Sequence, residues 1–178
     1  TAAIAGYGIG ARLEFLLIPL VFGLGASMTS LVGVNIGAGK ITRAERIGWI
    51  GGTAAAGLTG CVGIVLAIAP GLWMNLFTDD PATYAAGAAY LRIAGPAFLF
   101  QGLGLSLYFA SQGAGTVTWP VIATILRFVV AAGAAVVGVR WFGGGLEFVC
   151  ACISAGMVLY GAMTAASVYF GAWRAHRA

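Results

Sequence analysis

The sequence GIGARLEFLLIPLVFGLGASMTSLVGVNIGAGKITRAER, residues 8–46, decides the fold of this protein. It is a long apolar stretch that carries Arg12 and Glu14 near its start and Pro19 in its body. It ends in the glycine-rich segment 37–39, which is followed by basic residues. This pattern is typical of a membrane-spanning helix, kinked by proline, that leads into a basic loop.

The composition of the whole chain also indicates a membrane protein. Only 8% of its residues are charged and 61% are hydrophobic, whereas a soluble domain is usually about 25% charged. A helix needs about 20 mainly apolar residues to cross the hydrocarbon core. We therefore expect an all-α, polytopic bundle of five transmembrane helices in the lipid bilayer. Their expected ranges are 2–36, 41–69, 81–112, 118–140 and 147–174.

The basic residues predict how the chain lies in the membrane, because cytoplasmic loops collect Lys and Arg. Two basic groups are separated by four spans: Lys40, Arg43 and Arg46 after the first span, and Arg174, His176 and Arg177 in the tail. Five spans place both groups on one side, so we expect a cytoplasmic C-terminus. The basic residues form no stripe with interleaved aromatics, so we expect no nucleic-acid partner.

Several short patterns predict the loops. Glycines at 37–39 are suited to ending the first helix, since glycine readily takes the left-handed conformation at a helix C-terminus. The T-R-A-E sequence at 42–45 fits a capping box that opens the second helix. Trp73 indicates a short helix lying at the membrane surface. Pro81 is in a good first-turn position for the third span.

The sequence offers no chemistry that an enzyme would need. It has one His and no nucleophile, His or carboxylate arrangement at catalytic spacing, and it has no phosphate-binding loop for ATP. Cys150 and Cys152 are about 200° apart on a helix and face away from each other, so we interpret them as packing residues. We expect no enzyme activity, no metal site and no cofactor.

Charged residues at membrane depth are the candidates for a functional site. A charge at the bilayer centre costs about 2.5–3.5 kcal/mol on insertion scales, so it normally faces a cavity or a partner. Glu14 is the one acidic residue deep inside an expected span, away from its ends, and lies about 18 Å from the outer end of its helix. Arg92 lies at a similar depth, so a Glu14–Arg92 contact is allowed. Arg12 is a second possible partner.

Two interpretations of Glu14 stay open. Its carboxylate could bind a proton, a sodium ion or a cationic substrate, or it could be paired permanently with an arginine that sets the helix register. Gln101 is a further candidate for substrate or ion binding. Pro19, Pro96 and Arg127 are candidates for structure or gating, and we expect Arg127 to be structural or to extend toward the inner surface.

Residues 8–46 resemble the multidrug and toxic compound extrusion (MATE) transporters, and in particular their DinF/NorM-like members. That family has a helix with an R-x-E-like element, a mid-helix proline and an ending close to LVGQNxGAGxxxRA. The matching residues are Arg12, Glu14, Pro19, Leu31-Val32-Gly33, Asn35, Gly37-Ala38-Gly39, Arg43 and Ala44. Val34 departs from the usual Gln. A second similarity is A-S-Q-G-A-G at 110–115 followed by Pro120.

The resemblance implies two six-helix lobes around a central cavity, and alternating access driven by sodium or protons. Residues 1–178 look like helices eight to twelve, a partial C-lobe. The chain does not begin with Met, and we expect the N-lobe and helix seven upstream. The resemblance implies an antiporter in a bacterial or archaeal plasma membrane that exports small organic, often cationic, compounds. The stretch 98–106 lacks the acid that some members have near Gly102, which favours protons over sodium.

Two alternatives remain. The same superfamily contains flippases for lipid-linked oligosaccharides or polysaccharides, whose cavities are rich in arginine for phosphate groups. Arg12, Arg92 and Arg127 keep that interpretation open. The second alternative is a membrane scaffold without transport activity, which kinked, glycine-rich helices and a Glu at membrane depth disfavour.

Overall fold

The computed structural model describes residues 2–174, and every regular element in that range is a helix. The elements are α1 (Ala2–Gly37), α2 (Ile41–Ile68), the short α3 (Gly71–Met74), α4 (Pro81–Ala94), the 3-10 turn η1 (Gly95–Ala97), α5 (Phe98–Gly113), α6 (Thr118–Phe142) and α7 (Leu146–Tyr169). Because α4, η1 and α5 form one continuous rod, five helical segments are long and apolar enough to cross a membrane. This confirms the expected fold class.

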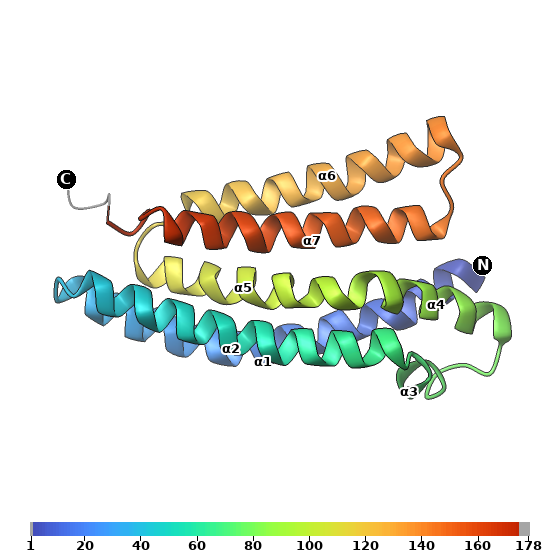
Figure 1. Ribbon diagram of the computed structural model, residues 1–178, viewed down its shortest axis with the longest axis horizontal. Helices are drawn as coiled ribbons and strands as arrows, with labels where there is room; N and C mark the ends of the chain where they lie inside the picture. Colours follow the sequence, from blue (N-terminus) through green and yellow to red (C-terminus); the bar gives the residue numbers. More distant parts are fainter. Residues whose placement is uncertain (1, 175–178) are drawn as a thin grey trace.

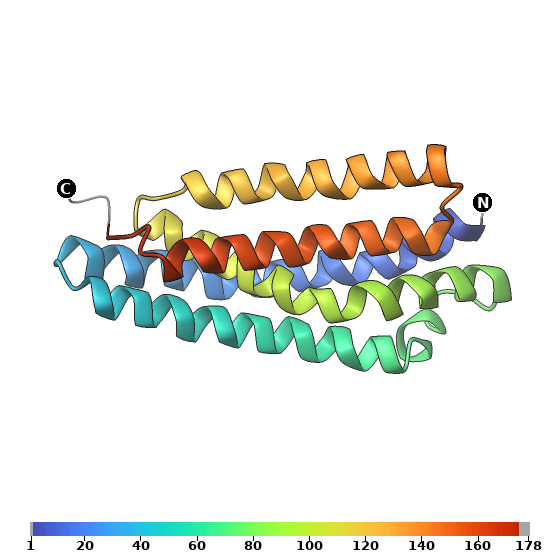
Figure 2. The ribbon, with the colours of Figure 1, turned by 45° about the horizontal axis from the view of Figure 1, so that its top comes forward.

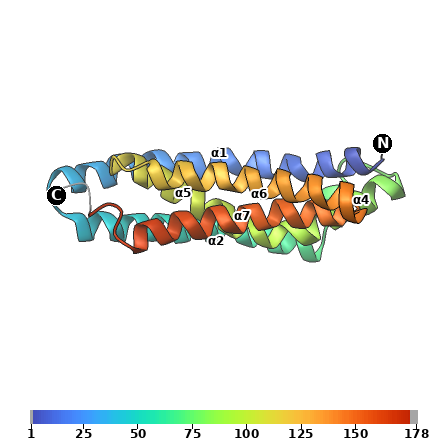
Figure 3. The same ribbon diagram turned by 90° about the horizontal axis from the view of Figure 1, so that it is seen from above.

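The spans form a body and an arm (Figures 1 and 2). The body consists of α1, α2 and the α4–α5 rod, which pack against one another along their lengths. The arm is the α6–α7 hairpin, in which α7 packs on the body through α4 and α5. In contrast, α6 packs along α7 and barely touches α5. Viewed from the arm side, α6 runs lengthwise between α1 and α7 (Figure 3).

Small residues allow the body helices to approach backbone to backbone. A Cβ added at Gly113 of α5 would lie 2.2 Å from the Thr29 carbonyl oxygen of α1, and one at Gly63 of α2 would lie 2.0 Å from the Gly95 oxygen. Without an apolar driving force between helices in lipid, such close packing is a main source of association. The outer surface is correspondingly apolar, with Phe15 and Phe128 exposed.

Pro96 changes the helix type in the third span. The chain adopts a 3-10 turn over Gly95–Ala97 before α5 begins, because proline lacks the N–H that an α-helical bond needs. The Ser154 hydroxyl of α7 donates to the Ile93 carbonyl at 3.3 Å. A neighbouring helix thus binds a carbonyl beside the break, as the bilayer requires. Pro19, by contrast, lies within α1, which is helical on both sides of it.

Glycines in the left-handed conformation mark the ends of several helices. Gly39 has φ 76°, after which the Lys40 N–H donates to the Asn35 carbonyl at 2.8 Å. Gly115 (φ 74°) and Gly143 (φ 64°) lie on either side of α6. The expectation that glycines 37–39 end the first helix is confirmed. At the start of α4, the Asp80 carboxylate caps the helix by accepting from the Thr83 N–H at 2.9 Å, and Pro81 is its first residue.

The expected capping box at 42–45 is wrong. Helix α2 begins at Ile41, so Thr42 already lies inside it, and no side chain caps its start. Glu45 instead accepts two hydrogen bonds from Arg174, from Nε and from Nη2, each at 2.7 Å. A forked, charged contact with arginine is stronger than a bond to a single backbone N–H, and it takes the carboxylate away from the helix end.

The last helix ends at Tyr169, five residues before the expected boundary at 174. Gly171 has φ 84°, and the chain turns back there. Trp173 is consequently buried, 2% exposed, with its indole N–H donating to the Ser111 hydroxyl at 3.2 Å. We call residues 170–174 the C-terminal hook. His176 and Arg177, which the orientation argument used, lie outside the described residues.

The α1–α2 loop and the C-terminal hook lie at the same end of the bundle (Figure 1). The opposite end carries α3, where the Trp73 indole N–H donates to the Ile9 carbonyl at 2.9 Å. The expected short helix around Trp73 is therefore present. Which end faces the cytoplasm remains a prediction, as does the assignment of the chain to a C-lobe.

Candidate functional site

Glu14 faces the junction between body and arm. Its side chain is 18% exposed, and one carboxylate oxygen lies 3.3 Å from Nη2 of Arg127 on α6. The other oxygen accepts from the Tyr90 hydroxyl of α4 at 3.4 Å. A carboxylate at this depth needs partners, because water is not there to solvate it. Helices α4 and α6 each supply one.

Arg127 reaches from the arm into the body. Its Nη1 donates to Oε1 of Gln101 on α5 at 2.5 Å, and its guanidinium lies 5.7 Å from the ring centroid of Tyr160 on α7. An arginine over an aromatic ring gains a cation–π attraction. Because α6 otherwise packs on α7, this side chain links α6 to α1 and α5. The expected extension toward the inner surface is not seen.

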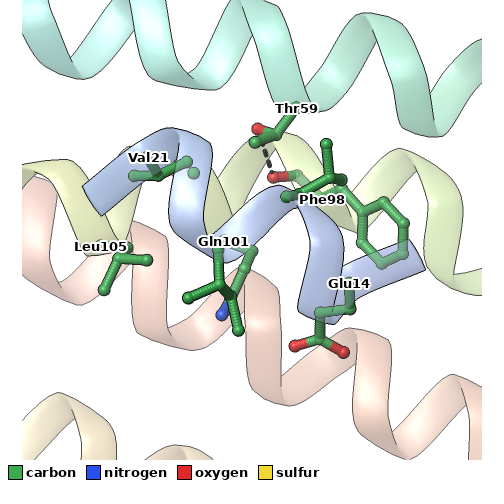
Figure 4. Close-up of a pocket in the computed structure, with 9 residues that line it drawn as sticks. Glu14, Val21, Thr59, Phe98, Gln101 and Leu105 are labelled. Atoms are coloured by element: carbon green, nitrogen blue, oxygen red, sulfur yellow. Dashed lines mark hydrogen bonds between the residues drawn. The ribbon is translucent and has the colours of Figure 1, made fainter. Parts of the chain in front are cut away.

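Two hollows meet at Glu14. One is a narrow pocket of about 10 Å³, room for about one water molecule, inside the body between α1, α2 and α5. Its lining is Glu14, Leu17, Ile18, Val21, Thr59, Phe98, Gln101, Gly102 and Leu105. Figure 4 shows the Glu14 carboxylate and the Thr59 hydroxyl on opposite sides of this pocket. The Thr59 hydroxyl donates to the Phe98 carbonyl at 2.8 Å. The other two polar side chains of the lining, Glu14 and Gln101, both bind Arg127 of α6.

The second hollow is an open groove of about 430 Å³ between the body and the arm. It shares Glu14, Ile18, Gln101 and Leu105 with the pocket, and the arm adds Val121, Thr124, Ile125, Arg127, Phe128 and Tyr160, while Tyr108 comes from α5. Its lining combines apolar and aromatic side chains with a few polar groups at one place. That combination is typical of sites for organic molecules.

Arg92 is not the partner of Glu14. The expectation of a Glu14–Arg92 contact rested on equal depth, but the helix face decides otherwise. Tyr90 is fully buried and faces Glu14, and Arg92 follows two residues later, about 200° around the helix. Arg92 is consequently exposed. The paired arginine that the structural interpretation required is Arg127.

The remaining candidates lie at different places. Arg12 is exposed, and its guanidinium lies 5.9 Å from the Phe77 ring centroid near α3. Gln101 lies in the site, bound to Arg127. Pro19 and Pro96 line neither hollow. Within residues 2–174, no cluster of three His, Cys, Asp or Glu side chains could hold a metal ion.

Sequence reasoning missed the tyrosines. Tyr90 donates to Glu14, Tyr160 lies beside Arg127, and Tyr108 lines the groove. A signal was available, because a tyrosine inside an apolar helix must find a partner for its hydroxyl or lie near a polar group. The sequence alone does not tell which tyrosines face the same cavity.

The chain matches no curated protein and no solved structure. It does match one protein-family model, described as MatE, over residues 1–137. This range includes Glu14, Gln101 and Arg127, and it ends before α7. Because the match covers most of the chain, the protein belongs to the MatE family, whose members are membrane transporters coupled to ion gradients and not enzymes.

Proposed function

We propose that this chain is part of a secondary active antiporter that exports organic, often cationic, compounds in exchange for protons or sodium ions. The observation that carries the proposal is the Glu14–Arg127 pair, held at the junction of a pocket and a groove. A carboxylate that faces a hollow in the membrane is a natural binding point for a cation. The aromatic and apolar lining of the groove suits the organic part of such a substrate.

In this proposal Glu14 changes partners during the cycle. In the structure, Arg127 Nη2 lies 3.3 Å from the Glu14 carboxylate, so the ion pair is formed. A proton on Glu14 removes its charge and weakens the attraction to Arg127, which keeps its bond to Gln101 and its contact with Tyr160. A cationic substrate could likewise replace the guanidinium at the carboxylate. Binding of the proton and binding of the substrate then compete for one group, which is the requirement for exchange.

Protons are the favoured coupling ion. A sodium ion would need several oxygen ligands close together, and Glu14 is the one carboxylate of the described residues that lines the pocket and the groove. Within the described helices, the other glutamates lie at helix starts, Glu45 in α2 and Glu147 in α7, away from this junction. A second acid for coupling would come from the N-lobe, which we expect upstream of this chain. We propose a bacterial or archaeal plasma membrane, with the C-terminus in the cytoplasm.

The flippase alternative has less support. It needs arginines that converge on a cavity, but Arg12 and Arg92 are exposed at other places, and Arg127 alone of the three lines the groove. The scaffold alternative gives no reason for a groove with charged residues in its lining.

The test uses the complete protein in proteoliposomes, with a fluorescent organic cation as substrate and a pH-sensitive dye for proton flux. Glu14→Gln should abolish substrate-driven proton movement while insertion and folding stay normal. Glu147→Gln, at an exposed helix start, is the matched control and should leave transport unchanged. Unchanged exchange in Glu14→Gln would contradict the proposal.

A further inference from the structure

A second groove lies at the end of the arm, away from Glu14. It has a volume of about 340 Å³ and lies where the start of α6 meets the end of α7 and the C-terminal hook. Its lining is Trp119, Met163, Ala166, Ser167, Phe170, Gly171 and Ala172. Ser167 already donates its hydroxyl to the Thr164 carbonyl at 2.7 Å, so the lining offers mainly apolar surface.

The groove lies at the ends of two candidate membrane spans. It opens beside the ends of two spans, where α6 begins at Thr118 and α7 ends at Tyr169. Two of its aromatic side chains are strongly exposed, Trp119 at 51% and Phe170 at 82%. Aromatic residues at helix ends are typical of the boundary between lipid tails and headgroups. An acyl chain is therefore the apolar group that reaches this surface most directly.

Arg174 places a positive charge at the rim of the groove. Its backbone N–H donates to the Gly171 carbonyl at 2.8 Å, and a Cβ at Gly171 would lie 3.3 Å from Arg174 Cδ. Glu45 binds its Nε and Nη2, which leaves Nη1 without a bond to Glu45. The side chain stays 65% exposed. Glu45 thus holds the guanidinium in place while part of it remains open to another anion.

The other apolar hollows lack this combination. The one at the opposite end, between α1 and α7, measures about 290 Å³ and has no Lys or Arg within two residues of its lining, whereas Arg174 follows two residues after Ala172. The one beside Arg140 is lined by residues of α6 alone and is the surface of a single helix. Lys40, Arg43 and Arg46 are exposed at the same end of the bundle as Arg174. At this end of the bundle, a groove between elements has aromatic side chains in its lining and the cation of Arg174 two residues beyond Ala172.

We propose that this groove binds an anionic phospholipid, with one acyl chain against Met163 and Ala166 and the phosphate held by Nη1 of Arg174. Basic residues beside clefts between transmembrane helices are suited to lipid phosphates. The site is separate from the Glu14 junction and does not depend on the proposed transport function. The lipid would join α6, α7 and the hook on the outside of the bundle.

The test measures lipid binding to the complete protein in detergent, by native mass spectrometry and thermal unfolding, with phosphatidylglycerol and phosphatidylcholine of equal chain length. Phosphatidylglycerol should bind more tightly and raise Tm more. Arg174→Gln should weaken phosphatidylglycerol binding about fivefold, as expected for one cation near an anionic lipid, and leave phosphatidylcholine unchanged. Arg140→Gln removes an equal charge at the opposite end and should change neither.

Three further measurements separate the site from its surroundings. Ala166→Trp should fill the groove and weaken both lipids, whereas Ala135→Trp on the face of α6 should not. Arg174→Lys should retain part of the preference for phosphatidylglycerol. Glu45→Gln frees the guanidinium and should retain that preference too. Its loss in both Glu45→Gln and Arg174→Gln would assign the effect to the shape of the hook and overturn the assignment to Arg174.

The proposal also fails if the two lipids bind equally, if Arg140→Gln has the same effect as Arg174→Gln, or if inorganic phosphate alone stabilises the protein as much as phosphatidylglycerol does. The last result would indicate a site for a simple anion.

Discussion

The protein contains two glutamate–arginine pairs that join distant parts of the chain in different ways. Glu45 and Arg174 meet through two bonds of 2.7 Å at the end of the bundle, and each has the other as its main charged partner. Glu14 and Arg127 meet once, at 3.3 Å, and each shares its charge with other groups. The first geometry is that of a forked contact that fixes two elements together. The second geometry leaves Glu14 and Arg127 able to take other partners, which is what the proposed transport site requires.

The largest difference between the pairs should appear in transport. Glu14→Gln should lower the rate of substrate efflux by about tenfold or more, since a hydrogen bond to a charged group is worth about 1.5–3 kcal/mol. Glu45→Gln should leave the rate within about twofold, because it removes a tether and no group of the groove. The measurement is initial efflux from proteoliposomes at equal protein density. Equal losses in both variants would remove the distinction between the pairs.

Stability should show the next largest effect, at Arg127. Arg127→Leu leaves the Glu14 charge without its cation at membrane depth. We expect the free energy of unfolding to fall by about 2–3 kcal/mol, below the about 3–5 kcal/mol of fully buried pairs, because both side chains are about one-fifth exposed. The double variant Glu14→Gln/Arg127→Leu should recover most of this loss, as measured by unfolding in detergent. A double variant as unstable as the sum of the singles would argue against a direct contact.

The hook should respond to the shape of arginine more than to its charge. Arg174→Lys keeps the charge but cannot make the forked contact with Glu45. We expect a small fall in Tm, less than that of Arg127→Leu, together with faster proteolysis after residue 169. Arg46→Lys, an exposed position near Glu45 in sequence, is the control. A fall in Tm as large as that of Arg127→Leu would mean that the Arg174–Glu45 contact of the hook stabilises the bundle as much as the Arg127–Glu14 contact does.

The smallest effect should come from Asp80, a carboxylate held by a neutral partner. Hydrogen bonds from the Thr83 hydroxyl, at 2.6 Å, and from the Thr83 N–H lower the pKa of Asp80 from its usual 3.8. The unfolded chain then takes up the proton first as pH falls, so this contribution is complete above about pH 4 and is lost below it. Thr83→Val should lower the stability slightly at neutral pH, where this contribution is present, and should flatten the acid limb of the profile. A loss of stability that stays equally large below about pH 3 would point to packing instead.

Sequence could predict the spans because length and apolarity decide them locally. The five spans, the glycine end of α1 and the first-turn Pro81 of α4 all depend on residues close in the chain. Depth along a helix could also be calculated from the rise per residue. That calculation placed Glu14 and Arg92 at the same level. It could not tell that α4 turns Tyr90, and not Arg92, toward Glu14.

The errors share this cause. Glu45 was expected to cap its own helix, but its partner is Arg174, which follows 129 positions later. Arg127 was expected to be structural or to extend to the inner surface, and its partner Glu14, which it binds across a groove, follows from no local pattern. The early end of α7 depends on Trp173, whose burial requires a gap between α2 and α5 beside Gly48. Contacts between elements far apart in sequence decide each of these features.

The two left-handed glycines at the ends of α6 have a mechanical consequence. Gly115 and Gly143 allow the backbone to change direction before and after the helix. The side chain of Arg127, through Glu14 and Gln101, holds α6 to the body. A helix with a glycine hinge on either side can rotate as a rigid body while its own hydrogen bonds stay intact. In the proposed transport cycle, such a movement of α6 would change the width of the groove beside Glu14 without any span having to unwind.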